Sequence, residues 1–455
     1  MNLKQYTTIY FIGIGGIGMS ALARYFHQLN YRVAGYDKTP TLLTKTLSEE
    51  GIIISYTDQG PTIASQLGSK EDVLIVYTPA IPSNHQEFNF FKEAGYTCIK
   101  RAALLGALTK QQKTLAVAGT HGKTTTSCLL AHVMEESTLK CSAFLGGIST
   151  NYNSNLLINP NSEWVVVEAD EFDRSFHQLH PYASIITSYD ADHLDIYGTK
   201  NELIEAFQHY TYQIDPNGAV VMQHELALQT DSHCLTYGVN VAQNDIDYKA
   251  YNLRYEDNTF LFDLKTPNEV WEQVALGISG IHNVENAVSV IALTQHIGID
   301  EATIRAALAS FKGVKRRFEY HILEEDIVFI DDYAHHPTAI NQLIASIRLR
   351  HANLPIVAVF QPHLYSRTAD FMGEFATSLA QADELFLLPI YAARELPLDG
   401  VSSDILLEKA PLENKQLVTP TSLIQQLAKR RNCVIVTIGA GDIDQLVQPL
   451  KEALL

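Results

Sequence analysis

The sequence has little cysteine and too few basic residues to balance its acids. Its 5 cysteines among 455 residues form no C-x-x-C pair, so neither a disulfide framework nor a structural zinc site is indicated. A reducing, cytoplasmic location is therefore expected. Lysine and arginine total 33 against 51 aspartates and glutamates, a net charge of −18, and such a field repels nucleic acid and anionic membrane surfaces. We expect no nucleic-acid partner, and any anionic ligand must be held by local groups.

The sequence also lacks a long hydrophobic run. No apolar stretch approaches the roughly 20 residues that cross a bilayer, so no membrane insertion is expected. The apolar stretch 9–23 carries glycines at turn spacing and no small-residue cleavage site, which favours a strand and a turn over a signal peptide. Low-complexity tracts and solenoid repeats are absent too. At roughly 150 residues per domain, the length suggests three globular domains.

The first part of the chain alternates predicted strands with helices. A strand at 7–14 leads into a glycine turn and a helix at 19–29, and further strands follow at 32–36 and 73–77. This alternation predicts a parallel, doubly wound sheet with its ligand at the carboxyl ends of the strands.

The turn carries Gly13-x-Gly15-x-x-Gly18, and Asp37 follows nineteen residues later. This spacing is typical of a dinucleotide site, in which the acid holds a ribose hydroxyl. It supports one alternative function, a nicotinamide-dependent oxidoreductase.

A second phosphate-binding pattern is the strongest local signal in the sequence. Residues 119–126 read Gly-Thr-His-Gly-Lys-Thr-Thr-Thr between a predicted strand at 114–118 and a helix. The glycines let backbone amides face a phosphate, Lys123 can reach the β and γ phosphates, and the Thr124 hydroxyl can bind Mg²⁺. Val117 stands where the strict P-loop has glycine, so the match is to a shorter variant.

Acidic residues follow the next strands of this part. Glu168 ends an apolar strand at 164–167, and Asp190, Asp192, His193 and Asp195 follow the strand at 183–188. An acid at a strand end beside a phosphate loop is where a nucleotide site places a magnesium ligand. Each acid alone is typical of a solvated loop, but Glu168 and His193 together with the loop favour a metal site. A hydride-transfer enzyme has no need of this second site, so the two loops suggest one nucleotide as substrate handle and another as energy source.

The remaining chain predicts an antiparallel excursion at 212–278, helices over 283–311, and a second, smaller doubly wound sheet beyond 313. The strands expected in that sheet lie at 326–330, 356–360, 385–388 and 434–438. His282, Asn283 and Asn286 open a predicted helix, where they could either contact a nucleotide base or cap the helix. Polar clusters at 331–337 and 361–368 follow predicted strands and are not typical of a core, because unpaired polar groups are costly to bury.

Taken in order, these motifs resemble the Mur ligases, ATP-dependent amide-bond-forming enzymes of peptidoglycan precursor synthesis. The resemblance spans essentially the whole chain, and eight motifs occur in the family's order. They lie at 13–19, 119–126, 168–176, 190–195, 282–287, 316–319, 331–337 and 360–368.

The resemblance implies three α/β domains. Residues 1–105 would form a Rossmann-like domain for the UDP-sugar, 106–312 a central P-loop ATPase-type domain with the antiparallel excursion, and 313–455 a Rossmann-like domain. This last domain would close over ATP and bind the amino acid. The implied activity joins L-alanine to the lactyl carboxylate of UDP-N-acetylmuramate through an acyl phosphate. A ligase of the same family that recycles murein tripeptide is the alternative within the family.

The resemblance also implies roles for individual residues, with ATP as co-substrate and Mg²⁺, expected as two ions, as cofactor. Lys123, His193 and Arg367 would be catalytic, and Thr124, Glu168 and His193 would serve the metal. The ATP site would comprise Gly119, Thr120, His121, Gly122, Lys123, Thr124, Thr125, His282, Asn283, Asn286, Arg317 and Asp332. The UDP-sugar site would comprise Gly15, Gly16, Ile17, Gly18, Met19, Asp37, Thr78 and Arg101, and the amino-acid pocket Tyr333, His335 and Arg367.

Two positions depart from the family pattern. Several relatives carry a lysine after the magnesium histidine that becomes carbamylated, whereas this chain has none between Asn201 and Pro216. Leu364 stands where the alanine-adding branch often has arginine, so recognition of the amino-acid carboxylate is expected to rest on Arg367, whose guanidinium forms a fork suited to a carboxylate.

Overall fold

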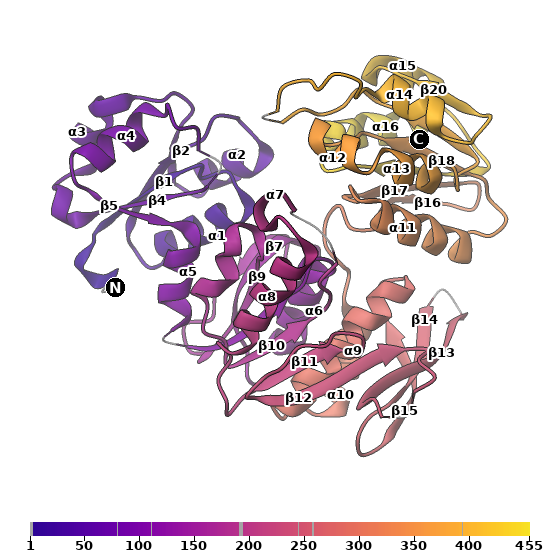
Figure 1. Cartoon of the computed structure of the whole chain (residues 1–455), viewed down its shortest axis with the longest axis horizontal. Helices are drawn as coiled ribbons and strands as arrows, with labels where there is room; N and C mark the ends of the chain where they lie inside the picture. Colours follow the sequence, from indigo (N-terminus) through magenta and orange to yellow (C-terminus); the bar gives the residue numbers. More distant parts are fainter. Residues whose placement is uncertain are drawn as a thin grey trace. The chain divides into compact units, whose positions relative to one another are not determined.

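The computed structural model describes residues 3–79, 81–110, 112–190, 194–243, 245–256, 259–393 and 395–455, without the side chains of residues 194 and 195. The chain divides into two compact units (Figure 1). Unit 1 comprises residues 1–254, 261–277 and 284–312, and unit 2 comprises residues 255–260, 278–283 and 313–455. Each unit is described by itself.

The amino-terminal sheet of unit 1 has five parallel strands in the order β3-β2-β1-β4-β5. The predicted doubly wound sheet is therefore confirmed. The order reverses between β1 and β4, and in such sheets ligands bind at this switch point. The strands are β1 (Thr8–Ile12), β2 (Arg32–Tyr36), β3 (Ile53–Ser55), β4 (Val73–Tyr77) and β5 (Thr97–Lys100), and the helices are α1 (Ile17–Gln28), α2 (Leu42–Glu49), α3 (Ala64–Leu67), α4 (Gln86–Glu93) and α5 (Arg101–Thr109).

A ten-stranded sheet forms the rest of unit 1's framework, in the order β15-β14-β13-β12-β11-β10-β6-β9-β7-β8. The predicted strand before the phosphate loop is β6, which pairs in parallel with β9 and β10. The strands are β6 (Lys113–Ala118), β7 (Ser142–Ser149), β8 (Ser154–Leu157), β9 (Trp164–Ala169), β10 (Ala183–Ile186), β11 (Ala219–Gln223), β12 (His233–Val239), β13 (Tyr248–Glu256), β14 (Thr259–Lys265) and β15 (Val270–Leu276).

The antiparallel excursion is smaller than the sequence predicts. Strands β11, β12 and β13 continue the sheet in parallel register, so antiparallel pairing from residue 212 onward is wrong for this part. Strands β13, β14 and β15 are neighbours joined by only two and four residues, and connections that short join antiparallel strands. A further antiparallel pair that the sequence did not predict is β7 with β8.

The helices of this part are α6 (Lys123–Glu136), α7 (Leu194–Tyr197), α8 (Lys200–Thr211), α9 (Ile281–His296) and α10 (Glu301–Ser310). The helical stretch predicted over 283–311 is thus two helices. They are separated at Gly298, whose φ is +90°, and α10 is capped by Asp300, whose carboxylate accepts the Thr303 N–H at 2.9 Å.

The two sheets of unit 1 share one apolar core. The Tyr25 ring on α1 lies 5.2 Å from the Phe144 ring on β7. The Arg24 guanidinium also donates to the buried Asn155 side chain at 2.7 Å. Helix α1, which begins at the glycine turn, is therefore fixed against the central sheet.

Unit 2 holds a sheet in the order β16-β17-β21-β18-β19-β20, in which only the β16–β17 pair is antiparallel. Two core clusters use alternate residues of the same strands, such as Val328 and Ile330 on one face and Ile327 and Phe329 on the other. Both faces are therefore covered, as a doubly wound sheet requires. The strands are β16 (Glu319–Leu323), β17 (Ile327–Asp332), β18 (Ile356–Phe360), β19 (Glu384–Leu387), β20 (Lys415–Leu417) and β21 (Cys433–Ile438), and the helices are α11 (Pro337–Arg350), α12 (Tyr365–Asp370), α13 (Met372–Leu379), α14 (Ser403–Lys409), α15 (Pro420–Leu427) and α16 (Val447–Leu454).

The chain thus has the three-part α/β architecture that the sequence predicts, with one sheet in each part. Within the described ranges, no helix is both long and apolar enough to span a membrane. The domain boundaries near residues 105 and 313 stay a prediction.

Candidate active site

The phosphate loop of unit 1 is hydrogen-bonded to the segment that follows β10. The Ser188 carbonyl accepts the Thr120 N–H at 3.1 Å, and the Ser188 hydroxyl accepts the His121 N–H at 3.0 Å. Gly119 has φ +136°, and a Cβ there would overlap the Thr187 hydroxyl. The loop passes so close to the end of the neighbouring strand that only glycine fits this position. It then turns directly into α6.

Lys123 begins α6 and is paired inside the protein. Its amine donates to the Gly119 carbonyl at 2.7 Å and to the Glu171 carboxylate at 2.9 Å. The Glu171 side chain is fully buried and that of Lys123 is 13% exposed. Burial alone would lower the pKa of Lys123, but Glu171, Asp170 and Glu168 outweigh it and raise that pKa. The amine therefore stays charged, as phosphate binding requires.

The predicted metal ligands in the described part of this site are Thr124 and Glu168. Thr124 is buried at the start of α6, and Glu168 on β9 lies in register with Val117, two residues before the loop begins. A Cβ on Gly146 of β7 would overlap the Glu168 carboxylate, so the glycine leaves room for it. A hydroxyl and a carboxylate are ligands that Mg²⁺ prefers, and these residues therefore fit that ion. His193 lies outside the described residues.

Helix α9 brings Asn286 to the same loop. A Cβ on Gly122, which has φ +79°, would come within 2.8 Å of the Asn286 amide oxygen. The loop and the predicted adenosine-contacting residue Asn286 are therefore neighbours within unit 1. Thr125 follows on α6, where it is partly exposed.

The amino-terminal glycine turn lies at the switch point of the first sheet. Asp37 accepts the Gly15 N–H at 2.7 Å and the Thr39 N–H at 3.1 Å, so its carboxylate braces the turn. A Cβ on Gly13, which has φ +86°, would come within 2.6 Å of the Thr78 methyl group. The structure thus brings together the turn, Asp37 and Thr78. Gly16 precedes α1, Ile17 begins it, and Met19 is buried one turn on.

Arg101, at the start of α5, lies between the glycine turn and the acidic segment after β9. A Cβ on Gly18 would come within 2.6 Å of Nη1 of Arg101, and Nη2 lies 3.6 Å from Oδ2 of Asp170. The neighbouring Lys100 amine contacts the Asp173 carboxylate at 2.6 Å. Because Asp170 precedes Glu171, Arg101 connects the first glycine turn with the segment that pairs with Lys123.

The remaining predicted ATP residues lie in unit 2. Asp332, at the end of β17, accepts the Phe318 N–H and the Ala334 N–H, each at 2.7 Å. Burial raises the pKa of Asp332 to about 6, against the opposing charge of Arg317. Burial and then Arg317 lower the pKa of His282 to about 4. The charge of Arg317 therefore acts on both residues.

Asn283 is buried beside His282 at the start of α9. Its amide group donates to the Ser279 carbonyl at 2.6 Å. A helix-capping side chain would instead accept a backbone N–H, so this contact ties the first turn of α9 to the segment that precedes it.

The predicted amino-acid residues follow β17 and β18 in unit 2. The Tyr333 and His335 rings lie 5.3 Å apart, and His335 lies 6.4 Å from His363, just before α12. Arg367 is partly exposed on α12 itself. Leu364, which precedes α12, has φ +70° and ψ 137°, a strained backbone for a branched residue. The departure in sequence therefore coincides with strain beside the predicted pocket.

Sequence reasoning missed two residues that the structure makes central. Glu171 was one acid among many in 168–173, and only its burial against Lys123 distinguishes it. Arg316 was one of a pair of arginines, and its side-chain partners, Asp331, Gly439 and Asp444, are distant in sequence. The available signal for Glu171 was its position two residues after the buried strand β9.

The chain belongs to the Mur ligase family. Its residues 8–113 match the model described as Mur ligase family, catalytic domain, residues 117–294 match the Mur ligase middle domain, and residues 316–441 match the Mur ligase, glutamate ligase domain. The members of this family are ATP-dependent ligases, so the sequence-based resemblance is confirmed.

Individual relatives are similar over the whole chain. The UDP-N-acetylmuramate–L-alanine ligase of Cytophaga hutchinsonii is 47% identical over 99% of this chain and 97% of its own length. That of Flavobacterium psychrophilum is 48% identical over 100% of this chain and 99% of its own. Among solved structures, the UDP-N-acetylmuramate-alanine ligase of Thermotoga maritima has a TM-score of 0.84 and 29% identity, with 98% of each chain covered. A murein peptide ligase from Psychrobacter arcticus shares the fold, with a TM-score of 0.74, 23% identity and 98% of each chain covered.

Proposed function

We propose that the protein joins L-alanine to the lactyl carboxylate of UDP-N-acetylmuramate and releases ADP and phosphate. The product would be an early precursor of peptidoglycan. The relatives that are 47–48% identical over nearly the whole chain carry this activity in their names, and the local geometry described above supplies the groups that it needs.

One observation supports this proposal most directly. Arg101 lies against Gly18 of the first glycine turn and 3.6 Å from Asp170 of the acidic segment, while the next residue, Glu171, pairs with Lys123 of the phosphate loop. A nucleotide-sugar at the turn and a triphosphate at the loop would therefore meet near Arg101. An oxidoreductase needs no such second site.

The chemistry follows from the weak reactivity of a carboxylate toward an amine. An oxygen of the lactyl carboxylate attacks the γ-phosphorus of ATP, and the bond from that phosphorus to ADP breaks. The amine of L-alanine then attacks the acyl carbon of the resulting acyl phosphate, phosphate leaves, and the amine loses a proton. Charge on the transferred phosphoryl is offset by Lys123 and by the loop N–H groups.

Residues of both units would serve the nucleotide. Within unit 1, Lys123, Thr124 and Asn286 lie at the loop. Within unit 2, Asp332 and His282 would contact adenosine, and Arg317 would approach the phosphates. A site that excludes water would protect the acyl phosphate from hydrolysis.

The metal would be held by Thr124, Glu168 and His193, and we propose two Mg²⁺ ions. When bound, they supply positive charge that neutralises the triphosphate. Gly146 would give Glu168 the space that this role requires.

The amino acid would be bound in unit 2 by Tyr333, His335 and Arg367, whose guanidinium suits a carboxylate. The absence of arginine at Leu364 leaves this recognition to fewer charges. We further propose domains at 1–105, 106–312 and 313–455, and a cytoplasmic location, where the nucleotide substrates are found.

A phosphate-release assay tests the proposal. With UDP-N-acetylmuramate, ATP and Mg²⁺ present, release is expected only after L-alanine is added. Release with murein tripeptide but not with L-alanine would assign the chain to the recycling branch instead. Lys123→Ala is expected to abolish release, and full activity of that variant would show that the loop is not the ATP site.

A further inference from the structure

Arg316 lies in the segment that precedes β16, where the backbone is unusual. Gly313, Arg316 and Phe318 all have positive φ, of 85°, 60° and 50°. Two of these residues are not glycine, and such left-handed backbone persists only where surrounding contacts impose it. Those contacts are made largely by Arg316 itself.

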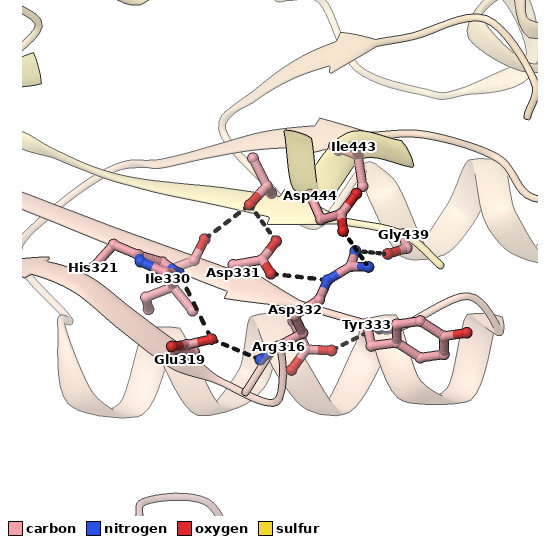
Figure 2. A network of polar contacts seen from close by, with 12 residues as sticks. Arg316, Glu319, His321, Ile330, Asp331, Asp332, Tyr333, Gly439, Ile443 and Asp444 are labelled. Carbon is pink, nitrogen blue, oxygen red and sulfur yellow. Dashed lines mark hydrogen bonds and ion pairs between the residues drawn. The ribbon is translucent and has the colours of Figure 1, made fainter. Parts of the chain in front are cut away.

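The Arg316 side chain connects three segments of unit 2 (Figure 2). Its Nε donates to Oδ2 of Asp331 at 3.2 Å, and its Nη2 donates to the Gly439 carbonyl at 2.7 Å. Its Nη1 lies 3.6 Å from the Asp444 carboxylate. Asp331 is 1% exposed and accepts a second hydrogen bond from the Thr437 hydroxyl at 2.7 Å. The guanidinium therefore ties the end of β17 to the turn after β21.

The backbone of Arg316 is used as well. Its N–H donates to Oε2 of Glu319 at 2.7 Å, and its carbonyl accepts the Tyr333 N–H at 2.7 Å. Its guanidinium lies 5.2 Å from the centre of the Tyr333 ring. Two residues further on, the Phe318 N–H donates to the Asp332 carboxylate. Residues 316–318 thus fix both Asp332 and Tyr333.

The neighbouring arginine has a different environment. Arg317 lies 5.0 Å from the Tyr333 ring. Among the described residues, its guanidinium has no hydrogen bond or ion pair. Arg316 is therefore committed to the protein, whereas Arg317 is available to a ligand. Glu319, His321 and Asp331 bring possible metal-ligand atoms within 4.8 Å of one another, but the positive charge against Asp331 is that of Arg316.

We propose that Arg316 is a positioning residue that couples the nucleotide pocket to the amino-acid pocket. Its side chain anchors the backbone of residues 316–318, which in turn holds Asp332 through the Phe318 N–H and Tyr333 through the Arg316 carbonyl. Asp332 would contact adenosine and Tyr333 would line the alanine pocket, so one side chain sets the geometry of both. This inference rests on the proposed function for the identity of the two ligands. Loss of the guanidinium would then weaken both ligands together, although Arg316 contacts neither.

The test uses Arg316→Gly in the full-length protein. Glycine adopts φ +60° without strain, so the substitution removes the side chain and spares the backbone. We expect the KM values for ATP and for L-alanine to rise together, each by about tenfold, as displaced positioning groups can cause. Guanidinium at non-denaturing concentration should fill the vacated space and lower both KM values again.

Two variants provide the comparison. Arg317→Met should lower kcat with little change in the KM for L-alanine, because that residue would act on the phosphates. Arg348→Lys changes an arginine of α11 that is bonded to Asp383 and to the Gln381 carbonyl, and both KM values should stay as in the unaltered protein.

The outcomes separate the two proposals. If the unaltered protein shows no alanine-dependent phosphate release, the proposed function fails, whatever the variants do. If it is active but Arg316→Gly keeps both KM values, or if guanidinium rescues neither, the positioning role is wrong. A loss confined to kcat, as in Arg317→Met, would instead make Arg316 a ligand-contacting residue and also overturn the inference.

Discussion

The buried pair of Lys123 and Glu171 allows a quantitative prediction about the free energy of unfolding. Lys123→Met leaves the Glu171 carboxylate, which is fully buried, without its ammonium partner. Breaking a buried pair in this way costs about 3–5 kcal/mol, because the remaining charge is not solvated. We therefore expect Lys123→Met to destabilise unit 1 by that amount.

A second lysine–glutamate pair, at the opposite ends of β6 and β9, provides a matched control. Lys113, at the other end of β6, contacts Glu163 at 3.0 Å, but these side chains are 46% and 61% exposed. Exposed pairs contribute only about 0.2–1 kcal/mol. Lys113→Met removes the same charge and should have a correspondingly small effect.

Urea unfolding followed by tryptophan fluorescence measures the difference. The chain has two tryptophans, Trp164 on β9 and Trp271 on β15, and both lie in unit 1. At a urea m-value of about 3 kcal/mol/M, Lys123→Met should lower the midpoint by about 1 M or more. The double variant Lys123→Met, Glu171→Leu removes both charges and should recover at least about 2 kcal/mol.

If Lys123→Met shifted the midpoint no further than Lys113→Met, the buried pair would contribute no more than the exposed one. A double variant that is no more stable than Lys123→Met would also contradict this prediction, because removal of the unpaired buried carboxylate should restore stability. Phosphate release should stay absent in both Lys123 variants, which separates the stability of the pair from the role of the lysine in ATP binding.

Three further predictions concern single positions. Gly146→Ala should displace Glu168 and raise the Mg²⁺ concentration for half-maximal phosphate release by about tenfold, as changes around metal ligands do. Gly18→Ala should displace the flexible end of Arg101 and raise the KM for UDP-N-acetylmuramate while the melting temperature is kept, because alanine favours the helix. Asp332 has a folded pKa of about 6 against 3.8 unfolded, so its neutral form is favoured in the folded state. The stability of the unaltered protein relative to Asp332→Asn should therefore fall, by up to about 3 kcal/mol, as pH rises from 4 to 7 in urea unfolding followed by circular dichroism.

Controls for these positions are available in the chain. Gly373 has no atom within 4 Å of an added Cβ, so Gly373→Ala should leave the Mg²⁺ dependence unchanged. A Cβ on Gly35 would overlap the Phe11 carbonyl, which cannot move as a side chain can. Gly35→Ala should therefore lower the melting temperature, in contrast to Gly18→Ala. Equal melting temperatures for Gly18→Ala and Gly35→Ala would contradict the first of these contrasts. Unchanged Mg²⁺ dependence in Gly146→Ala would contradict the prediction for Glu168. For Asp332, the contradicting result is a stability of the unaltered protein, relative to Asp332→Asn, that rises with pH.

The sequence was most informative where structure is local. The phosphate loop at 119–126 and the turn at 13–18 need glycine at fixed positions, so spacing alone located both. The alternation of strands and helices likewise predicted the parallel first sheet, because parallel neighbours require such connections. The boundaries of β17 shifted enough to place Asp331 and Asp332 in the strand.

Long-range pairing was less accessible. Short alternating segments after residue 212 look alike whether their neighbours are parallel or antiparallel, so β11 to β13 were predicted in the wrong sense. The role of Glu171 depends on a lysine 48 residues away, and Arg316 on a carbonyl 123 residues away. A local sequence pattern cannot indicate contacts between residues so far apart in the chain. The role of His193 rests on sequence alone, because this residue lies outside the described ranges.

The proposed activity uses ATP to join L-alanine to UDP-N-acetylmuramate on a single chain. The most direct measurement is mass spectrometry of the nucleotide-sugar after incubation with ATP, Mg²⁺ and L-alanine, with released phosphate determined in parallel. We predict one L-alanyl group added in amide linkage for each phosphate released, and no addition when ATP is omitted. An unmodified nucleotide-sugar despite phosphate release, or an addition that occurs only with murein tripeptide, would show that the protein is not an L-alanine ligase.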